Sequence, residues 1–403
     1  MFSKRTRLFV HFNLINFFHI LKSLFVNKRD FQIYLKDFLK VENLSLTSLG
    51  RTALYDIVKI IISRSGKKNF FIAPYTIPAV IHAIIYAGGK VSYIDINKTT
   101  GLIDETKLEE KMDEDTAGVI ITHLYSESNA IKNFINKFEN KITIIEDAAI
   151  NFGAKLEDKF LGTLGHYGFY SFALVKNLNT FTGGALYIKD KEIFDDYILK
   201  RKTKKFPFLK TMSLLFTTII IKTFFNNISY QIFHYFLKLV YLKKIELILK
   251  KIYPILFHKL EDKIPDIYSF DFNWTMNDLG IYNLKKIKKG VEKRIVKAKL
   301  YSQLISDNVA VKSNCLSGEN ALLEFTVILK NENNMEAHQK LMEEGYDVRH
   351  TWYINNIKED KYSKKNEFKD SFFLEEKILC LPLHENISDN DIRKISDIIN
   401  TFK

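Results

Sequence analysis

The sequence has few of the residues that hold together small secreted or metal-dependent proteins. Cysteine occurs only twice among 403 residues, at Cys315 and Cys380, so no disulfide framework can form and a reducing cytoplasm is the simplest setting. The histidines show no metal-ligand spacing, so the sequence predicts no metal site. No apolar run reaches the ~18 residues that a membrane-spanning helix needs.

What is present indicates an ordinary globular protein. Apolar residues make up 46% and charged residues 27% of the chain, which excludes a disordered protein. A chain of 403 residues is too long for one small core, so we expect a large domain and a smaller one.

The net charge of +13 is unevenly distributed along the chain. Residues 1–40 hold eight Lys or Arg and two acids, residues 200–263 hold fourteen and three, and the rest is mildly acidic. Both basic segments are also rich in Phe, Ile and Leu, and neither carries a nucleic-acid motif. This combination favours peripheral contact with the anionic inner face of a membrane and predicts no nucleic-acid partner.

The first basic segment predicts an amphipathic surface helix over residues 8–25. At about 100° per residue, one arc gathers polar residues, namely His11, Asn13, Asn16, His19 and Lys22. The opposite arc is apolar and holds Val10, Leu14, Phe17, Phe18, Leu21, Leu24 and Phe25. The polar interruptions and the lack of a small-residue cleavage site argue against a signal peptide. The helix is expected to lie on a membrane, or to pack on the protein's own body or a second subunit, and the sequence leaves these alternatives open.

Residues 45–189 alternate short apolar strands with helical stretches. The expected strands are Phe70–Ala73, Val91–Ile96, Gly118–Thr122, Ile142–Ile145, Phe169–Phe172 and Ala185–Ile188, and the expected helices are 52–64, 78–87 and 129–138. This rhythm predicts an α/β fold with a mostly parallel sheet covered on both faces. In such sheets ligands bind at the carboxyl ends of the strands.

The remaining segments complete a three-part organisation. Residues 200–263 break the rhythm and are expected to form an inserted helical hairpin or pair of helices. The last third predicts a long helix at 277–304, a β-α-β module (321–329, 334–344 and 346–349) and a final helix at 389–402. We therefore expect an N-terminal region (1–43), a large domain (44–270) containing the insert, and a smaller C-terminal α/β domain (271–403).

Two motifs carry residues suited to catalysis. Asp147 follows a buried strand in Ile144-Ile145-Glu146-Asp147-Ala148-Ala149. About thirty residues later, Ser171-Phe172-Ala173-Leu174-Val175-Lys176-Asn177 leaves another strand, and Gly183-Gly184 opens the next. Singly these are weak signals, because such an Asp is usually a helix cap and a lone Lys is usually solvated. Their order and spacing resemble those of the DegT/DnrJ/EryC1/StrS sugar aminotransferases.

The resemblance extends over about three quarters of the chain. Similar stretches are Ser48-Leu49-Gly50-Arg51-Thr52-Ala53-Leu54, Ala73-Pro74-Tyr75-Thr76-Ile77-Pro78-Ala79, Tyr93-Ile94-Asp95 with Thr100-Gly101-Leu102-Ile103-Asp104, His123-Leu124-Tyr125, and Leu381-Pro382-Leu383-His384. The two basic segments lie outside it. The resemblance implies a transferase of fold type I (aspartate aminotransferase-like) that depends on pyridoxal 5′-phosphate (PLP) and acts as a homodimer.

The resemblance also implies roles for individual residues. Lys176 matches the lysine that forms the Schiff base with PLP and moves the proton, and Asp147 matches the carboxylate that holds the protonated ring nitrogen. The phosphate is expected at a helix N-terminus, where the matching residues are Gly50, Arg51, Thr52 and Ser171, with Asn273 contributed across the dimer. Three positions depart from the family pattern, namely Ile150, Thr182 and Thr275, and Ile77 stands where an aromatic residue commonly stacks on the ring.

The implied activity is transfer of an amino group from glutamate or glutamine to a keto-sugar, usually nucleotide-linked, for a surface polysaccharide or glycolipid. Because Lys176 is present, the chain differs from the branch in which histidine replaces the lysine. The alternative is a PLP-binding sensor or scaffold at the membrane without turnover.

Overall fold

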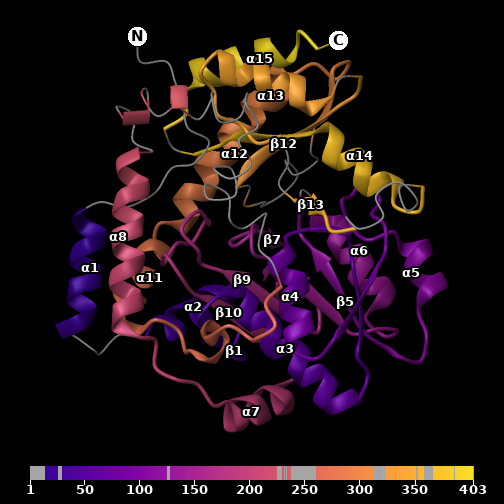
Figure 1. The fold of residues 1–403 in the computed structure, drawn as a ribbon, viewed down its shortest axis with the longest axis vertical. Coiled ribbons are helices and arrows are strands. Elements are labelled where there is room, and N and C mark those ends of the chain that lie inside the picture. The colour runs from indigo at the N-terminus through magenta and orange to yellow at the C-terminus, as the bar shows by residue number, and fades with distance from the viewer. Residues whose placement is uncertain are drawn as a thin grey trace.

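The computed structural model describes most of the chain, namely residues 14–25, 30–124, 128–224, 229–230, 232, 234–236, 260–312, 321, 323–331, 333–350, 353–357, 366–384 and 386–402. Among these residues, a large and a smaller α/β unit follow one another along the sequence (Figure 1).

A seven-stranded sheet forms the centre of the large unit. Its strands lie in the order β1 (Leu44–Thr47), β10 (Gly184–Ile188), β9 (Tyr167–Ser171), β6 (Ile144–Asp147), β5 (Thr116–Thr122), β2 (Asn69–Ile72) and β4 (Lys90–Tyr93). The five strands from β9 to β4 are parallel, and β10 is antiparallel to both of its neighbours. Central strands such as β5 are buried along their whole length, which explains their continuous apolar runs. The predicted mostly parallel sheet and its six expected strands are confirmed.

Helices cover both faces of this sheet. One face packs on α3 (Gly50–Ser65), α4 (Pro78–Tyr86) and α7 (Lys191–Lys200). The other face packs on α5 (Glu105–Lys111) and α6 (Ser128–Phe138), and nearer β1 on α2 (Phe31–Leu39) and α11 (Asn277–Leu284). The helices expected at 52–64, 78–87 and 129–138 are α3, α4 and α6. The chain therefore buries the large sheet between two helical layers, as α/β folds do.

The smaller unit is built on an antiparallel sheet of three strands, β11 (Ala310–Lys312), β12 (Glu324–Leu329) and β14 (Ile378–Pro382). Its helices are α12 (Ile287–Leu304), α13 (Asn334–Glu343), α14 (Lys369–Lys377) and α15 (Asp389–Ile399). The prediction of a second strand at 346–349 in the β-α-β module was wrong, because this segment pairs with β14 only at Arg349, opposite Cys380.

The prediction of a single long helix at 277–304 was also wrong. It divides into α11 and α12, with a break at Lys285 and Lys286. The physical reason is that its two halves are buried in different cores. Leu279 on α11 packs under the large sheet, whereas Tyr301 on α12 packs in the core of the smaller unit, so the helix axis must turn between them.

A short two-stranded sheet connects the two units. It pairs β3 (Tyr75–Thr76) of the large unit with β13 (Ile354–Asn355) of the smaller one. The side-chain amide of Asn356 donates to the carbonyl oxygens of Pro74 at 2.9 Å and Thr76 at 2.8 Å. The smaller unit is thereby fixed over the loop at 73–79.

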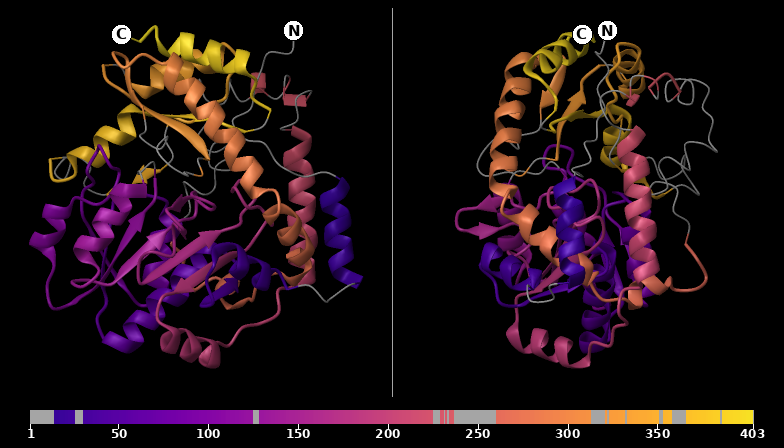
Figure 2. Two further views of the ribbon diagram at one scale, coloured as in Figure 1. Left: turned by 180° about the vertical axis from the view of Figure 1, so that it is seen from behind. Right: turned by 90° about the vertical axis from the view of Figure 1, so that its left-hand side faces the viewer.

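Two helices lie side by side at one side of the molecule, α1 (Leu14–Phe25) and α8 (Phe208–Phe224) (Figures 1 and 2). The helix expected over 8–25 is confirmed from Leu14 on, and residues 8–13 lie outside the described residues. In the insert, α8 is one helix of the predicted hairpin or pair, and most of residues 225–259 lie outside the described part. Within the part that the structure describes, no helix is both long and apolar enough to cross a bilayer.

Both helices pack on the body through their less apolar sides. On α1 the buried positions are Asn16, Ile20 and Ser23, and on α8 they are Thr211, Leu215 and Thr218. The opposite sides expose large apolar side chains, including Ile15 (50%), Phe18 (64%), Leu209 (82%) and Phe216 (66%). The side of α1 that carries Asn16, Ile20 and Ser23 therefore contacts the protein's own body, whereas Lys22, from the predicted polar arc, is exposed.

Candidate active site

Asp147 lies at the carboxyl end of β6, in the middle of the large sheet. Its side chain accepts a hydrogen bond from the N–H of Ala149 at 3.1 Å, and only 5% of the residue is exposed. Burial raises the pKa of Asp147 above its ordinary value, while the Ala149 N–H and the positive charges of Lys176 and His123 lower it. The carboxylate is thus poised to bind a cation that enters the site.

Lys176 lies in the turn after β9, the strand next to β6. Removal of its ammonium group from water lowers the pKa of Lys176 from 10.5 to about 8, opposed by the negative charge of Asp147. The structure therefore places a readily deprotonated amine within electrostatic reach of a buried carboxylate.

Glu146, the neighbour of Asp147, has a supporting role. Its carboxylate accepts hydrogen bonds from the N–H groups of Gly162 at 2.9 Å and of Leu164 and Gly165 at 2.7 Å. His123 Nε2 lies 3.2 Å from Glu146 Oε2, the oxygen that also accepts from Gly162. Glu146 thus fixes the loop at 162–165 against β6, which holds Asp147 in position.

The first turn of α3 lies against the end of β9. The helix begins at Gly50, as expected, and its N-cap residue, Leu49, provides no side-chain hydrogen bond. A Cβ atom on Gly50 would lie 2.8 Å from the Cβ of Ser171, so only glycine allows this approach. First-turn N–H groups without a capping side chain form a natural site for a phosphate.

The glycine pair is required by the same close packing. Gly183 has a φ of +113°, which is favourable only for glycine. A Cβ on Gly184 would lie 2.5 Å from the backbone nitrogen of Gly50. The hydroxyl of Thr182, which precedes the pair, donates to the carbonyl oxygen of Ser48 at 2.9 Å. Thr182 therefore ties β10 to the segment that leads into α3.

The other residues expected at the phosphate make contacts with neighbouring side chains of the protein. The Thr52 hydroxyl is hydrogen-bonded to the Ser48 hydroxyl at 2.9 Å. The guanidinium of Arg51 lies 6.0 Å from the centre of the Tyr268 ring. Asn273 is fully buried, and its amide nitrogen donates to the Thr211 hydroxyl on α8 at 2.9 Å. Its assignment across a dimer stays a prediction.

Comparison with known proteins identifies the family. The model of the DegT/DnrJ/EryC1/StrS aminotransferase family matches residues 24–205 and 261–400. The chain belongs to this family. The gap in the match coincides with most of the basic insert, and the match begins inside α1.

Individual relatives match over shorter lengths. GDP-perosamine synthase of Escherichia coli O157:H7 is 26% identical over 38% of this chain and 43% of its own length. A UDP-4-amino-4,6-dideoxy-N-acetyl-beta-L-altrosamine transaminase of Campylobacter jejuni is 31% identical over 34% and 37%. The chain thus spans about two fifths of the length of these two curated relatives. A Yersinia pseudotuberculosis GDP-4-keto-6-deoxy-D-mannose 3-dehydratase is 24% identical over 80% of this chain and 78% of its own.

Solved structures share the fold over nearly the whole chain. The Helicobacter pylori PseC aminotransferase of pseudoaminic acid biosynthesis aligns with a TM-score of 0.71 at 16% identity, covering 99% of both chains. A GDP-4-keto-6-deoxymannose-3-dehydratase with a trapped PLP-glutamate geminal diamine gives 0.72 at 16%, covering 98% of this chain and 100% of its own. The fold-type-I architecture is confirmed.

The positions that depart from the family pattern lie around this site. Ile150 is buried after Asp147 and provides no polar group. Residues 148–151 form a turn, and the amide of Asn151 donates to the carbonyl oxygen of His123 at 3.4 Å. The hydroxyl of Thr275 donates to Asn273 Oδ1 at 2.9 Å, so it holds the asparagine side chain in place.

The smaller unit contributes site residues that the sequence did not indicate. The charges of Arg349 and Glu324 both act on the pKa of Lys176, and Arg349 Nε lies 3.3 Å from Glu324 Oε1. Tyr353 is buried within electrostatic reach of Asp147, and its ring meets that of Tyr75 edge-on at 5.7 Å. These residues are distant in sequence from both motifs, and no local pattern marks them.

The site fits the cofactor that the family resemblance implies. It offers an amine, a buried carboxylate for a ring nitrogen, and a helix N-terminus for a phosphate. Several buried polar atoms beside these groups have no hydrogen-bond partner among the described residues, namely Arg51 Nε, Thr122 Oγ1 and Asn177 Oδ1. Because buried polar groups in native proteins are normally paired, such atoms are consistent with a polar ligand in this site.

Proposed function

We propose that this protein is a PLP-dependent aminotransferase that moves an amino group from glutamate or glutamine to a keto-sugar. The proposed sugar is nucleotide-linked and serves a surface polysaccharide or glycolipid. The observation that carries the proposal is the Asp147–Lys176 pair at the carboxyl end of the sheet. The names of the matched relatives, a perosamine synthase and amino-sugar transaminases, support the substrate class.

Asp147 and Lys176 are proposed to have different tasks. When bound, PLP supplies the electron sink for bond breaking at the amino-bearing carbon. Asp147 holds a proton on the ring nitrogen, because a buried carboxylate strongly favours a cationic partner. With a pKa of about 8, Lys176 is deprotonated in roughly a tenth of molecules at pH 7. Its Nζ can therefore act as a nucleophile and then carry a proton to and from the substrate carbon.

The phosphate site is proposed at the first turn of α3, from Gly50, Arg51 and Thr52, together with Ser171. The helix dipole and the first N–H groups favour an anion there. We further propose a homodimer in which Asn273 reaches the partner's phosphate. Reaching it requires the amide of Asn273 to leave its hydrogen bond with Thr211.

Spectra of the purified protein test the activity. Bound cofactor should absorb at about 420 nm and shift to about 330 nm when glutamate or glutamine donates its amino group. Borohydride reduction before any amino donor is added, followed by peptide mass mapping, should find the pyridoxyl adduct on Lys176. An adduct on another lysine contradicts the assignment. Cofactor binding without any spectral shift, with any amino donor, would support the sensor or scaffold instead.

We also propose that α1 and α8 hold the enzyme on the inner face of an anionic membrane. Both helices face η3 (Trp274–Met276) with their buried sides, since Thr211 binds Asn273 and α1 contacts η3. Their apolar sides therefore point away from the body. Lys22 on α1 is exposed, and so are Lys205 before α8 and Lys210 in its first turn, although the ammonium groups of the last two lie over the rings of Trp274 and Phe270. Each lysine near an anionic surface contributes about 1 kcal/mol, and inserted apolar side chains add to that.

Flotation with vesicles tests the membrane proposal. The full chain should float with vesicles that contain phosphatidylglycerol, and less so at high salt. A variant with Phe18→Ser, Leu209→Ser and Phe216→Ser should lose flotation. Leu199→Ser combined with Val296→Ser, which removes exposed apolar side chains elsewhere, is the matched control. If the unaltered chain stays in the soluble fraction at low salt, α1 and α8 form a protein interface instead.

A further inference from the structure

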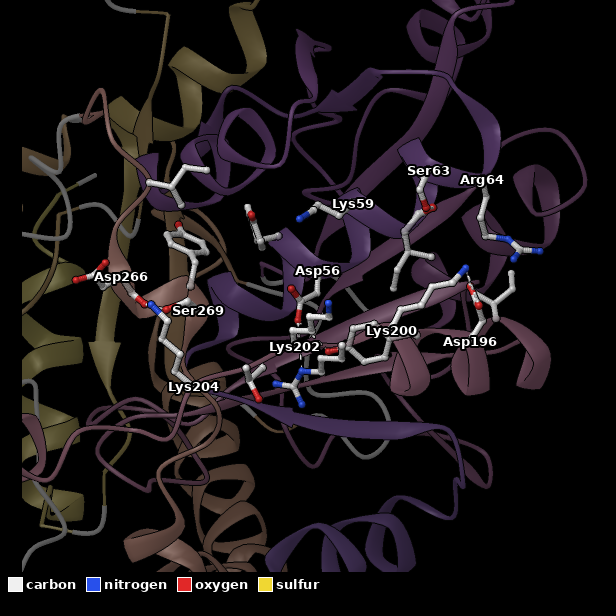
Figure 3. Close-up of a pocket in the computed structure, with 18 of the residues that line it drawn as sticks. Asp56, Lys59, Ser63, Arg64, Asp196, Lys200, Lys202, Lys204, Asp266 and Ser269 are labelled. Atoms are coloured by element: carbon white, nitrogen blue, oxygen red, sulfur yellow. Dashed lines mark hydrogen bonds and ion pairs between the residues drawn. The ribbon is translucent and has the colours of Figure 1, made fainter.

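A hollow lies at the root of the insert, on the outer side of α3. It has a volume of about 680 Å³ and is bounded by the later turns of α3, the end of α7, and the segments 201–204 and 264–269 (Figure 3). This volume is within the range of small-molecule sites, which are about 300–1,000 Å³. Lys176 and Asp147 are not among its lining residues.

The hollow has an excess of positive charge. Six Lys or Arg side chains and three carboxylates line it. Lys200 forms an ion pair with Asp196 at 2.7 Å, and Arg201 lies 3.9 Å from Asp56. The four remaining cations form no ion pair within 4.0 Å among the described residues, namely Lys59, Arg64, Lys202 and Lys204. The charge of Lys59 also acts on Asp56. The one other acid of the lining is Asp266.

A network of hydrogen bonds and ion pairs holds the walls of the hollow in place. The Tyr197 hydroxyl donates to Asp56 at 2.8 Å. Arg201 donates to the Ser45 hydroxyl at 3.1 Å and pairs with Asp271 at 3.2 Å. The walls are therefore held by groups from α3, α7 and β1, while the four cations without an ion pair are exposed to solvent.

The hollow connects the insert to the active site. The chain leaves for the insert and returns beside itself, because Lys204 exchanges backbone hydrogen bonds of 2.8 Å with Ser269 and Asp271. The ring of Tyr268, in the wall, lies 5.0 Å from the Tyr55 ring and 6.0 Å from the guanidinium of Arg51. Arg51 belongs to the first turn of α3. A ligand here would touch the root of the insert and a helix that also forms the candidate phosphate site.

We propose that this hollow binds a phosphate-bearing anion. Lysine and arginine without carboxylate partners, arranged around a concave surface, recognise phosphate through charge-assisted hydrogen bonds. The excess of three positive charges favours a multivalent anion over a single carboxylate. Such a group has two sources, a free phosphate compound or the headgroup of an anionic lipid that the insert brings close.

Isothermal titration of the cofactor-loaded full chain with inorganic pyrophosphate tests the site. Saturable binding is expected, and the variant Lys59→Gln, Lys202→Gln, Lys204→Gln should weaken it by roughly a hundredfold, since three contacts are lost and each contact at a solvent-exposed charge is worth about fivefold. The control is Lys288→Gln, Lys289→Gln, Lys293→Gln on α12, where the lysines are also exposed. No binding by the unaltered protein, or equal binding by both variants, overturns the proposal.

Phosphatidylglycerol vesicles distinguish the two sources. If the anion is a lipid headgroup, excess pyrophosphate should release the protein from these vesicles, and the variant at 59, 202 and 204 should float less than the control variant. If it is a free phosphate compound, pyrophosphate should bind while flotation of the two variants stays equal. Because binding is measured without turnover, failure here is distinct from failure of the aminotransferase proposal.

Discussion

Replacement of Lys176 by methionine should stabilise the cofactor-free protein. Burial lowers the pKa of Lys176 from 10.5 to about 8. Each pKa unit corresponds to about 1.4 kcal/mol, so the protonated ammonium costs the folded state about 3 kcal/mol at pH 7. Methionine keeps a similar length without the charge. Asp147 loses an attractive charge in this variant and takes up a proton more readily, so we expect a net gain of about 1–3 kcal/mol in the free energy of unfolding.

The sign of the pH dependence follows from the lowered pKa. The unfolded lysine binds a proton up to pH 10.5, whereas the folded one loses it near pH 8. The penalty on the wild type is therefore complete below pH 8 and disappears as the pH rises toward 10.5. Between pH 7 and about 9.5, the stability gap should shrink by roughly half.

Urea unfolding of both cofactor-free proteins at these two pH values measures the gap. The control is Lys288→Met on the exposed side of α12, which should show no gap that changes with pH. The reasoning is refuted if Lys176→Met is less stable than wild type at pH 7. It is equally refuted if the gap is the same at both pH values.

Three further predictions concern single positions. Asp147→Asn should keep the fold but reduce transamination by more than a hundredfold, because a neutral amide cannot hold the ring proton and each increase of about 1.4 kcal/mol in the barrier slows the reaction tenfold. Near-normal turnover would exclude this role for Asp147. Gly184→Ala should destabilise the protein by roughly 1–3 kcal/mol and weaken cofactor binding, because the added Cβ meets Gly50, and an unchanged melting temperature would contradict the close contact. Asn356→Ala should lower the free energy of unfolding by about 1–3 kcal/mol, because it leaves the carbonyls of Pro74 and Thr76 unpaired, and it should speed proteolysis near residue 75. Unaltered proteolysis would argue against a link between the two units.

Much of the large unit could be predicted because its strands are buried on both faces. A strand such as β5 is buried along its whole length, so the apolar run at 117–121 between its terminal threonines marks it from the sequence alone. The order of Asp147, Lys176 and the glycine pair likewise carried the family signal, since each is held to the end of a strand or to a close backbone contact. Gly184 illustrates this, because its residue type is dictated by the nitrogen of Gly50.

Only the tertiary structure determined which residues distant in the sequence contact the site and where the predicted helix divides. Arg349 and Glu324 act on Lys176 from another unit, and no spacing in the sequence joins them to it. The break between α11 and α12 arises because two separate cores bury the two halves, although the sequence is helical throughout.

The two basic segments show the same division most clearly. The sequence determined that α1 has a polar and an apolar arc, because hydrophobic periodicity depends only on residue order. Which arc meets the body depended on the surface that receives it. The Ser23 hydroxyl accepts from the N–H of Asp278, and Thr211 accepts from Asn273, so polar contacts hold α1 and α8 in place. The apolar sides face outward because hydrogen-bonding groups on the body select the opposite sides, and such pairing cannot be read from a helix by itself.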